Sequence, residues 1–238
     1  MRSRWIFRWL AALPILVAAG PASGAPLAGV GANDVVRIGI VLTILALLPT
    51  ILIAMTSFTR IVIVLSMVRH AFGMPETPPN SVLVSLALFL TMFSMAPVAG
   101  ELNRQAVEPY LDGRMQLDIA MERGSAPLRR FMLAQTRQED LATVYRAAHT
   151  PLPRRSSEVE LAKLVPAFII NELRVAFTIG FVILLPFLLI DLVVSAILLS
   201  LGMMMVPPTT ISLPIKLLMF VLVDGWSLII LGVLGSFR

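Results

Sequence analysis

Four long apolar stretches alternate with polar segments along the chain, at about residues 38–55, 82–99, 175–201 and 211–237. Each approaches the roughly 20 residues that a helix needs to cross a bilayer. Pro and Gly lie between the first two stretches and again between the last two, where a helix is expected to stop. The pattern therefore predicts an all-α, membrane-associated protein built from two helical hairpins.

A polar segment at residues 100–163 separates the two hairpins, and it carries 10 basic and 9 acidic side chains. Apolar residues recur at three- and four-residue steps through 125–148, which predicts one amphipathic helix that starts near Ser125. Pro151 and Pro153 end it, and a further helix is expected to begin near Ser157. This segment is predicted to be helical.

Composition narrows the class of protein further. Apolar residues make up 58% of the chain and charged residues 14%, which disfavours an ordinary soluble globule. Cysteine is absent and only two histidines are present, so we expect no disulfide, no metal site and no cofactor. The net charge of +5 comes without a basic run interleaved with aromatics, so nucleic acid is not an expected partner.

The first 24 residues have the pattern of a cleaved secretory signal peptide. Arg2, Arg4 and Arg8 precede a short apolar run, and Ala22 and Gly24 suit cleavage before Ala25. A retained short anchor is the alternative. With cleavage, the new N-terminus is outside the cytoplasm.

The signal peptide also sets the expected topology. It places residues 100–163 in the periplasm, although their arginines would favour the cytoplasm under the positive-inside rule. We give the signal more weight, because long segments translocate largely regardless of charge. The expected organisation is a signal peptide at 1–24, a first hairpin at 25–99, a polar periplasmic segment at 100–163 and a second hairpin at 164–238.

Charged residues within or beside the apolar stretches are candidate functional sites, because an ionisable group at bilayer depth is costly unless it is paired or hydrated. They are Glu172, Arg174, Asp191, Lys216 and Asp224. The alternative is that these helices do not face lipid at all.

A fold-back at residues 206–209 would bring Asp191 and Asp224 to the same depth, each roughly 25 Å from the bend. The same register puts Lys216 opposite Leu199 and leaves Glu172 out of its reach. Arg174 is a poor partner for Glu172, because residues two apart point to different sides of a helix. We therefore expect Lys216 to pair with Glu172 of another copy, which implies a ring or spiral of subunits.

Prolines interrupt the apolar stretches, among them Pro186, and each is expected to kink its helix. The bend of the second hairpin reads GMMMVPP, with Gly202 before three methionines and Pro207 and Pro208 after them. Flexible methionine side chains can fill gaps at a crowded turn. Repeated around an axis, Met203, Met204 and Met205 would instead form a soft ring able to close a hole.

Three long stretches carry a resemblance to a known family. They are MTSFTRIVIVLSMVRHAFG, TPPNSVLVSLALFLTMF and the segment from VPAFIINELRVAF to LPIKLLMFVLVDGW. Together they closely resemble the flagellar biosynthetic protein FliP family over about residues 35–99 and 158–235. The resemblance implies an export-gate subunit of the flagellar type III secretion apparatus. It also implies a methionine-rich pore gasket at Met203, Met204 and Met205.

The resemblance also implies partners and place. The partners are further copies of the chain, Q- and R-type export-gate subunits, the B- and A-type export apparatus proteins and unfolded flagellar substrates. The location is the bacterial inner membrane. The family's charged positions correspond to Glu172, Asp191, Lys216 and Asp224, whereas Arg174 and Ile215 replace a lysine and a phenylalanine. A virulence-type (injectisome) export-gate subunit is the alternative. An ion-coupled transporter using Asp191 and Asp224 is a further alternative, and an enzyme is not expected, since no nucleophile–base pair is present.

Overall fold

The computed structural model describes residues 39, 42, 43, 46, 49–51, 53–74 and 76–237. The predicted signal peptide at 1–24 lies outside them. The chain divides into two units, Met1–Leu47 and Leu48–Arg238. In the first unit, Thr43 Oγ1 donates a hydrogen bond to the Gly39 carbonyl at 2.8 Å. Every regular element among the described residues is helical and none is a strand, so the all-α prediction is confirmed.

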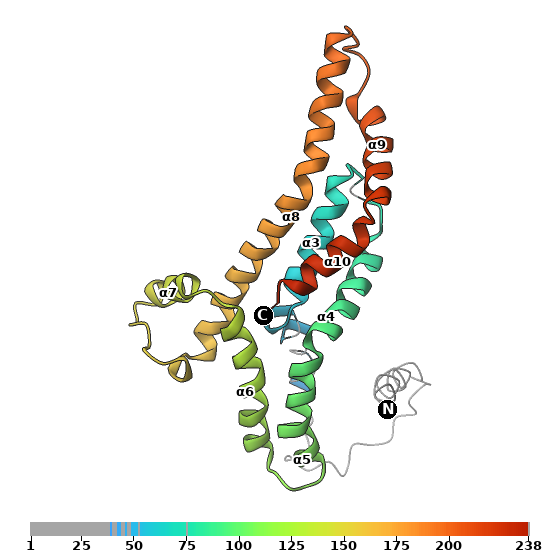
Figure 1. Ribbon diagram of the computed structural model, residues 1–238. Coiled ribbons are helices and arrows are strands. Elements are labelled where there is room, and N and C mark those ends of the chain that lie inside the picture. The colour runs from blue at the N-terminus through green and yellow to red at the C-terminus, as the bar shows by residue number, and fades with distance from the viewer. Residues whose placement is uncertain are drawn as a thin grey trace. The chain divides into compact units, whose positions relative to one another are not determined.

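Helix α3 (Phe58–Ala71) is the centre of the main hydrophobic core, and it lies between α8 and α4 (Figure 1). Ile61, Val64, Leu65 and Val68 are each at most 1% exposed and follow the spacing of one helix face. The sequence pattern treats this stretch as the connection of the first hairpin. It is instead a buried helix, because TRIVIVLSMV is mostly apolar and contains no Pro or Gly to break it.

Helix α4 (Asn80–Leu102) follows and continues through a π-helical turn, η2 (Asn103–Val107), into the short α5 (Glu108–Leu111). Its buried residues recur at three- and four-residue steps, as Leu83, Ala87, Leu90, Thr91 and Met95 show. The other faces of α4 carry exposed large apolar side chains. One stripe of α4 therefore packs inside this chain, and the remainder is apolar and uncovered.

The polar segment forms α6 (Leu117–Gln135), α7 (Gln138–Ala147) and a 3-10 turn, η3 (Ser156–Glu158). The expected single helix over 125–148 ends where predicted, at Ala147, but its start and its continuity are wrong. Ser125 lies inside α6, where its hydroxyl donates to the Glu122 carbonyl. The extended backbone at Thr136 and Arg137 separates α6 from α7.

A second core cluster joins this polar segment to the start of α8. Its buried members are Met132, Tyr145, Val159, Leu164 and Phe168. They come from α6, α7, the connection after η3, and α8. The polar segment therefore packs directly on the first turns of α8.

Helix α8 (Leu161–Ser200) has 40 residues and contains Pro166 and Pro186. Helix α9 (Pro208–Leu222) returns along it, and α10 (Gly225–Gly235) leaves α9 at an angle of 66° (Figure 1). The fourth apolar stretch is thus two helices, because Asp224 adopts a left-handed conformation with φ 50° between them.

Within the part of the chain that the structure describes, two helices are long and apolar enough to cross a membrane, Asn80–Leu111 and Leu161–Ser200. The number rises to four if each bent helix pair counts as one span. The prediction of membrane-associated, bent apolar helices is confirmed. The count of four segments is the upper limit of what the described residues allow.

Candidate functional site

The methionine loop, residues 201–207, joins α8 to α9. Gly202 has φ +73°, a conformation that glycine adopts without strain, and this turns the chain away from the α8 axis. The amide of Met203 donates to the Leu198 carbonyl at 2.9 Å, which completes the end of α8. Pro207 precedes α9 and Pro208 is its first residue, where a missing N–H costs no helical hydrogen bond.

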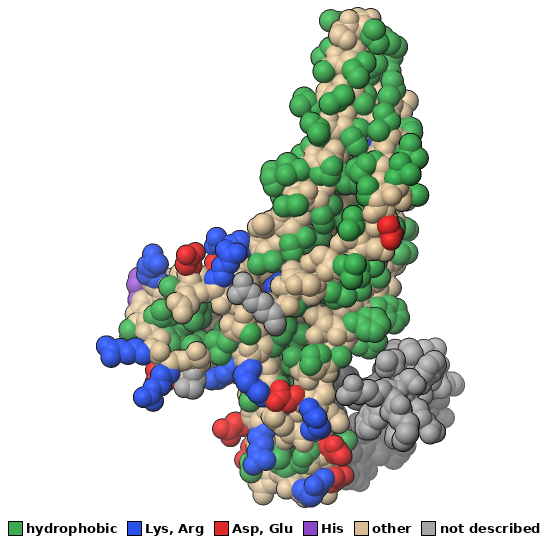
Figure 2. Space-filling model, in the orientation of Figure 1, with side chains coloured by type: hydrophobic (Ala, Val, Ile, Leu, Met, Phe, Trp, Pro, Cys, Tyr) green, Lys and Arg blue, Asp and Glu red, His purple; other side chains and the backbone are tan. Residues whose placement is uncertain are grey.

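The three methionines of this loop are open to the surroundings. Met203 is 44% exposed, Met204 80% and Met205 95%. Within one chain they therefore do not fill a gap, since their side chains have little to pack against. Figure 2 shows hydrophobic side chains over the α8–α9 part of the molecule and most charged side chains over the α5–α7 part.

A buried ion pair links α3 to α8. Arg60 Nε donates to Glu172 Oε2 at 2.7 Å and Arg60 Nη2 to Glu172 Oε1 at 2.5 Å, with the side chains 1% and 0% exposed. Two parallel hydrogen bonds are the strongest arrangement in which an arginine binds a carboxylate. Glu172 is thus satisfied inside the chain.

Arg60 also binds the last residues of the chain. Its Nη1 donates to the carbonyl and the hydroxyl of Ser236, both at 2.9 Å, and its guanidinium lies 4.0 Å from the ring centre of Phe237. This role was not predicted from the sequence, in which Arg60 belongs to the connection between the first two apolar stretches. The sequence feature that could have indicated it is the arginine directly before the apolar run IVIVL. A charge buried beside such a run requires a partner.

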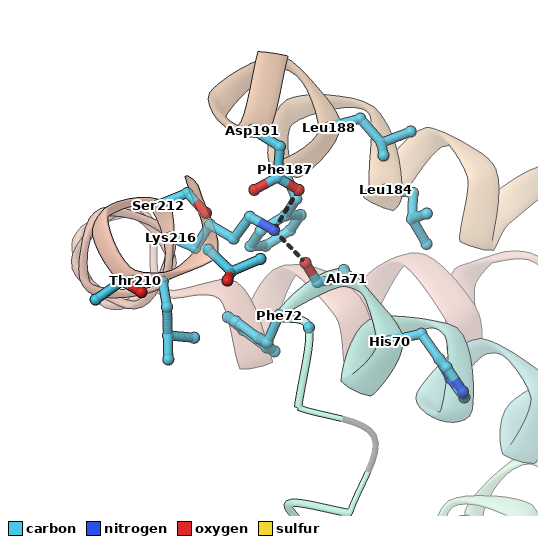
Figure 3. A pocket seen from close by; sticks show the side chains of 13 residues that line it. His70, Ala71, Phe72, Leu184, Phe187, Leu188, Asp191, Thr210, Ser212 and Lys216 are labelled. Carbon is cyan, nitrogen blue, oxygen red and sulfur yellow. Dashed lines mark hydrogen bonds and ion pairs between the residues drawn. The ribbon is translucent and has the colours of Figure 1, made fainter. Parts of the chain in front are cut away.

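Lys216 is also a buried charge, at 3% exposure. Its ammonium donates to Asp191 Oδ2 at 2.6 Å and to the Ala71 carbonyl at 3.1 Å, so it joins α9 to α8 and to the end of α3 (Figure 3). A cavity of about 370 Å³ lies beside this pair, and Phe187 and Ser212 are among its lining residues.

The expected pairing of Lys216 with Glu172 of another copy is not the one in this structure. Each group has a partner within its own chain, Asp191 for Lys216 and Arg60 for Glu172. The error came from the position of the bend. Because the chain turns at 201–207 rather than 206–209, Lys216 lies opposite Asp191 instead of Leu199.

The other two charges lie in different settings. Arg174 Nη2 is 2.7 Å from Asp140 Oδ1, and its side chain is 50% exposed whereas that of Asp140 is 2% exposed. Asp224 is exposed at the break between α9 and α10. The expected placement of Asp191 and Asp224 at the same depth is therefore wrong, since Lys216 lies opposite Asp191 and Asp224 lies beyond the end of α9.

Pro186 lies inside α8, as expected, and its ring takes the place of a backbone donor.

Among the residues that the structure describes, no group of three or more His, Asp or Glu side chains is placed to hold a metal ion. The arrangement offers fixed ion pairs between helices and a soft apolar loop.

Comparison with known proteins gives consistent matches. A sequence model described as the FliP family matches residues 41–233. The flagellar biosynthetic protein FliP of Pectobacterium carotovorum is 51% identical over 198 residues, covering 83% of this chain and 77% of that protein. FliP of Bacillus subtilis is 49% identical over 205 residues, with coverage of 86% and 93%. FliP of Caulobacter vibrioides is 48% identical over 211 residues, with coverage of 88% and 79%.

Proposed function

Because the chain belongs to the FliP family, we propose that it is a core subunit of the flagellar type III protein export gate, required for flagellum assembly. Copies of the chain, together with Q- and R-type subunits, form the channel through which unfolded flagellar proteins leave the cytoplasm. The B- and A-type export proteins are its further partners. The chain has no catalytic role in this proposal and acts as a channel wall in the bacterial inner membrane.

The observation that carries the channel role is the exposure of the methionine loop. Met204 and Met205 are 80% and 95% exposed although they are apolar, and the loop contains no charge. Exposed apolar side chains at the end of a hairpin are stabilised when copies of the loop meet around an axis. Methionine is flexible enough to close that axis and to yield to a passing chain.

The uncovered apolar faces support the assembly. Only 17% of the most apolar window of α8 is buried inside the chain, and 28% of that of the Asn80–Leu111 helix. These faces need lipid or neighbouring subunits to cover them. In this proposal the signal peptide at 1–24 is removed, the segment 100–163 is periplasmic, and the two hairpins, 25–99 and 164–238, contribute to the channel.

The seal has a direct test. Replacing Met203, Met204 and Met205 together by alanine in the assembled complex removes most of the apolar volume at the constriction. We expect cells that carry this variant to take up small solutes that wild-type cells exclude. Triple replacement at exposed apolar positions away from the loop, Leu111, Leu117 and Met121, is the matched control and is expected to leave permeability unchanged.

The assembly is tested at the same time by native mass spectrometry of the complex purified in mild detergent. The alanine variant is expected to assemble with its partners as the wild type does. A wild-type chain that remains monomeric with its partners co-expressed would contradict the channel. An assembled alanine variant with unchanged permeability would contradict the seal.

A further inference from the structure

The methionine loop carries three thioethers that the rest of the same chain leaves largely uncovered. Met204 and Met205 are 80% and 95% exposed, whereas Met132 and Met95, in the packed part of the chain, are 0% and 7% exposed. Oxidation of methionine depends on access of the oxidant to the sulfur. The loop therefore offers reactive sites, and Met132 offers an internal standard that is protected by burial.

The surroundings of the loop make a polar change there consequential. No Asp, Glu, Lys or Arg occurs between Asp191 and Lys216, and Leu201 beside the methionines is 67% exposed. A hydroperoxide transfers one oxygen atom to the thioether sulfur. The O–O bond breaks, an S=O bond forms, and the peroxide is reduced to water or an alcohol while the sulfur is oxidised. The product, methionine sulfoxide, is polar and accepts hydrogen bonds.

We propose that the methionine loop is an oxidation site, and that hydroperoxides convert Met204 and Met205 to sulfoxides and so open the seal. This inference rests on the proposed function for its consequence, and for its chemistry on the exposure of the loop within a single chain. In the assembled ring, hydroperoxide reaches the thioethers from the mouth of the constriction. Sulfoxides in the ring hold water that thioethers exclude, so the constriction becomes hydrated and small solutes pass. A methionine sulfoxide reductase, with a thiol as its two-electron reductant, restores each thioether, releases the oxygen as water and closes the seal again.

The oxidation site is tested by peptide mapping. Membranes that contain the assembled export complex are treated with graded hydrogen peroxide, and mass spectrometry locates each added oxygen. We expect Met204 and Met205 to be oxidised at peroxide concentrations that leave Met132 unchanged. A loop oxidised no faster than Met132 would overturn the proposal.

The effect on the seal is tested by solute uptake with and without peroxide. Wild-type cells are expected to show a roughly tenfold rise in solute uptake. A tenfold change requires only a small shift in the free energy of the closed constriction relative to the open one. The triple variant Met203→Leu, Met204→Leu, Met205→Leu cannot form sulfoxides, so peroxide should not raise its uptake. For each strain, uptake with peroxide is compared with uptake without it. A difference in permeability between the variant and the wild type before treatment therefore does not affect the result.

Two controls separate the loop from other methionines. Met92 and Met121 are 49% and 61% exposed, and the double variant Met92→Leu, Met121→Leu is expected to respond to peroxide as the wild type does. Treatment of oxidised membranes with the reductase should reverse the leak. An equal peroxide response in the triple leucine variant and the wild type would overturn the proposal.

The two proposals fail in different ways. If the alanine variant without peroxide keeps a tight membrane, the seal function is wrong, whatever the mapping shows. If the alanine variant leaks but the oxidised wild type does not, the seal stands and the oxidation inference is overturned.

Discussion

At the scale of single residues, the buried charges are stable because each has a partner from a distant part of the chain. Arg60 and Glu172 are 112 positions apart and share two hydrogen bonds at essentially zero exposure. Removing both charges from water is costly, and their mutual bonds offset that cost only while both are present. Ser236, Phe237 and Gln135 also contact the guanidinium. The pair therefore determines how α3, α8 and the end of the chain meet.

Replacing Glu172 by alanine is expected to destabilise the fold by about 3–5 kcal/mol, because it leaves the Arg60 charge buried without its carboxylate. The measurement is the midpoint of thermal unfolding of the purified protein in detergent. Replacing Arg60 and Glu172 together by methionine removes both charges, and the midpoint should recover in part.

The surface pair of Lys163 with Glu160, whose side chains are 17% and 63% exposed, provides the control. Glu160→Ala is expected to cost at most about 1 kcal/mol, since water already screens that pair. Equal losses for Glu160→Ala and Glu172→Ala would show that burial of the Arg60 pair contributes nothing.

At the scale of elements, the backbone conformation of two residues causes the break between α9 and α10. Asp224 has φ 50°, and a Cβ on Gly225 would lie 2.1 Å from Phe220 Cε2. The bend thus needs one residue that tolerates the left-handed region and a second with no side chain. Because Asp224 is exposed, its carboxylate is not part of a buried relay.

This geometry predicts that the backbone at Asp224 matters more than its charge. Asp224→Gly and Asp224→Asn are expected to keep flagellar protein secretion, because both residues adopt positive φ readily. Asp224→Val is expected to reduce secretion and to lower thermal stability by about 1 kcal/mol or more, because a β-branched residue is strained there. Loss of secretion in the asparagine variant, with its fold intact, would show that the carboxylate itself is required.

At the scale of the whole molecule, Lys216 fixes the second hairpin to the first part of the chain. Its ammonium binds Asp191 of α8 and the Ala71 carbonyl at the end of α3. The methionine loop lies between the two helices that this contact joins. A shift of Lys216 would therefore change where the loop is held.

A charge exchange distinguishes pairing within one chain from pairing between copies. Asp191→Lys and Lys216→Asp are each expected to impair secretion, and the double variant in one chain should recover part of it. Co-expression of the two single variants should give no recovery, because each chain still lacks its own partner. Recovery by co-expression, measured as secreted flagellar protein, would show that the pair forms between copies instead.

The apolar periodicity was enough to predict the class of fold, since long apolar runs can only be helices in a membrane setting. It did not predict α3 as a core helix. A buried helix of 14 residues has the same apolar pattern as a connecting segment when the helices that pack against it are unknown. Five charges in the second hairpin, residues 164–238, were found as exceptions to an apolar pattern. Their partners Arg60 and Asp140 were not, because those contacts span 112 and 34 positions.

The sequence by itself determined the helical, membrane-associated character of the chain, its family and the methionine loop, because these depend on local composition and on residues adjacent in the chain. Only the tertiary structure decided that Lys216 binds Asp191, that Arg60 binds Glu172 and that Asp224 faces outward. The position of one bend, at 201–207, sets the first of these pairs. A shift of a few residues in a helical hairpin changes every contact across it, and local patterns do not contain that register.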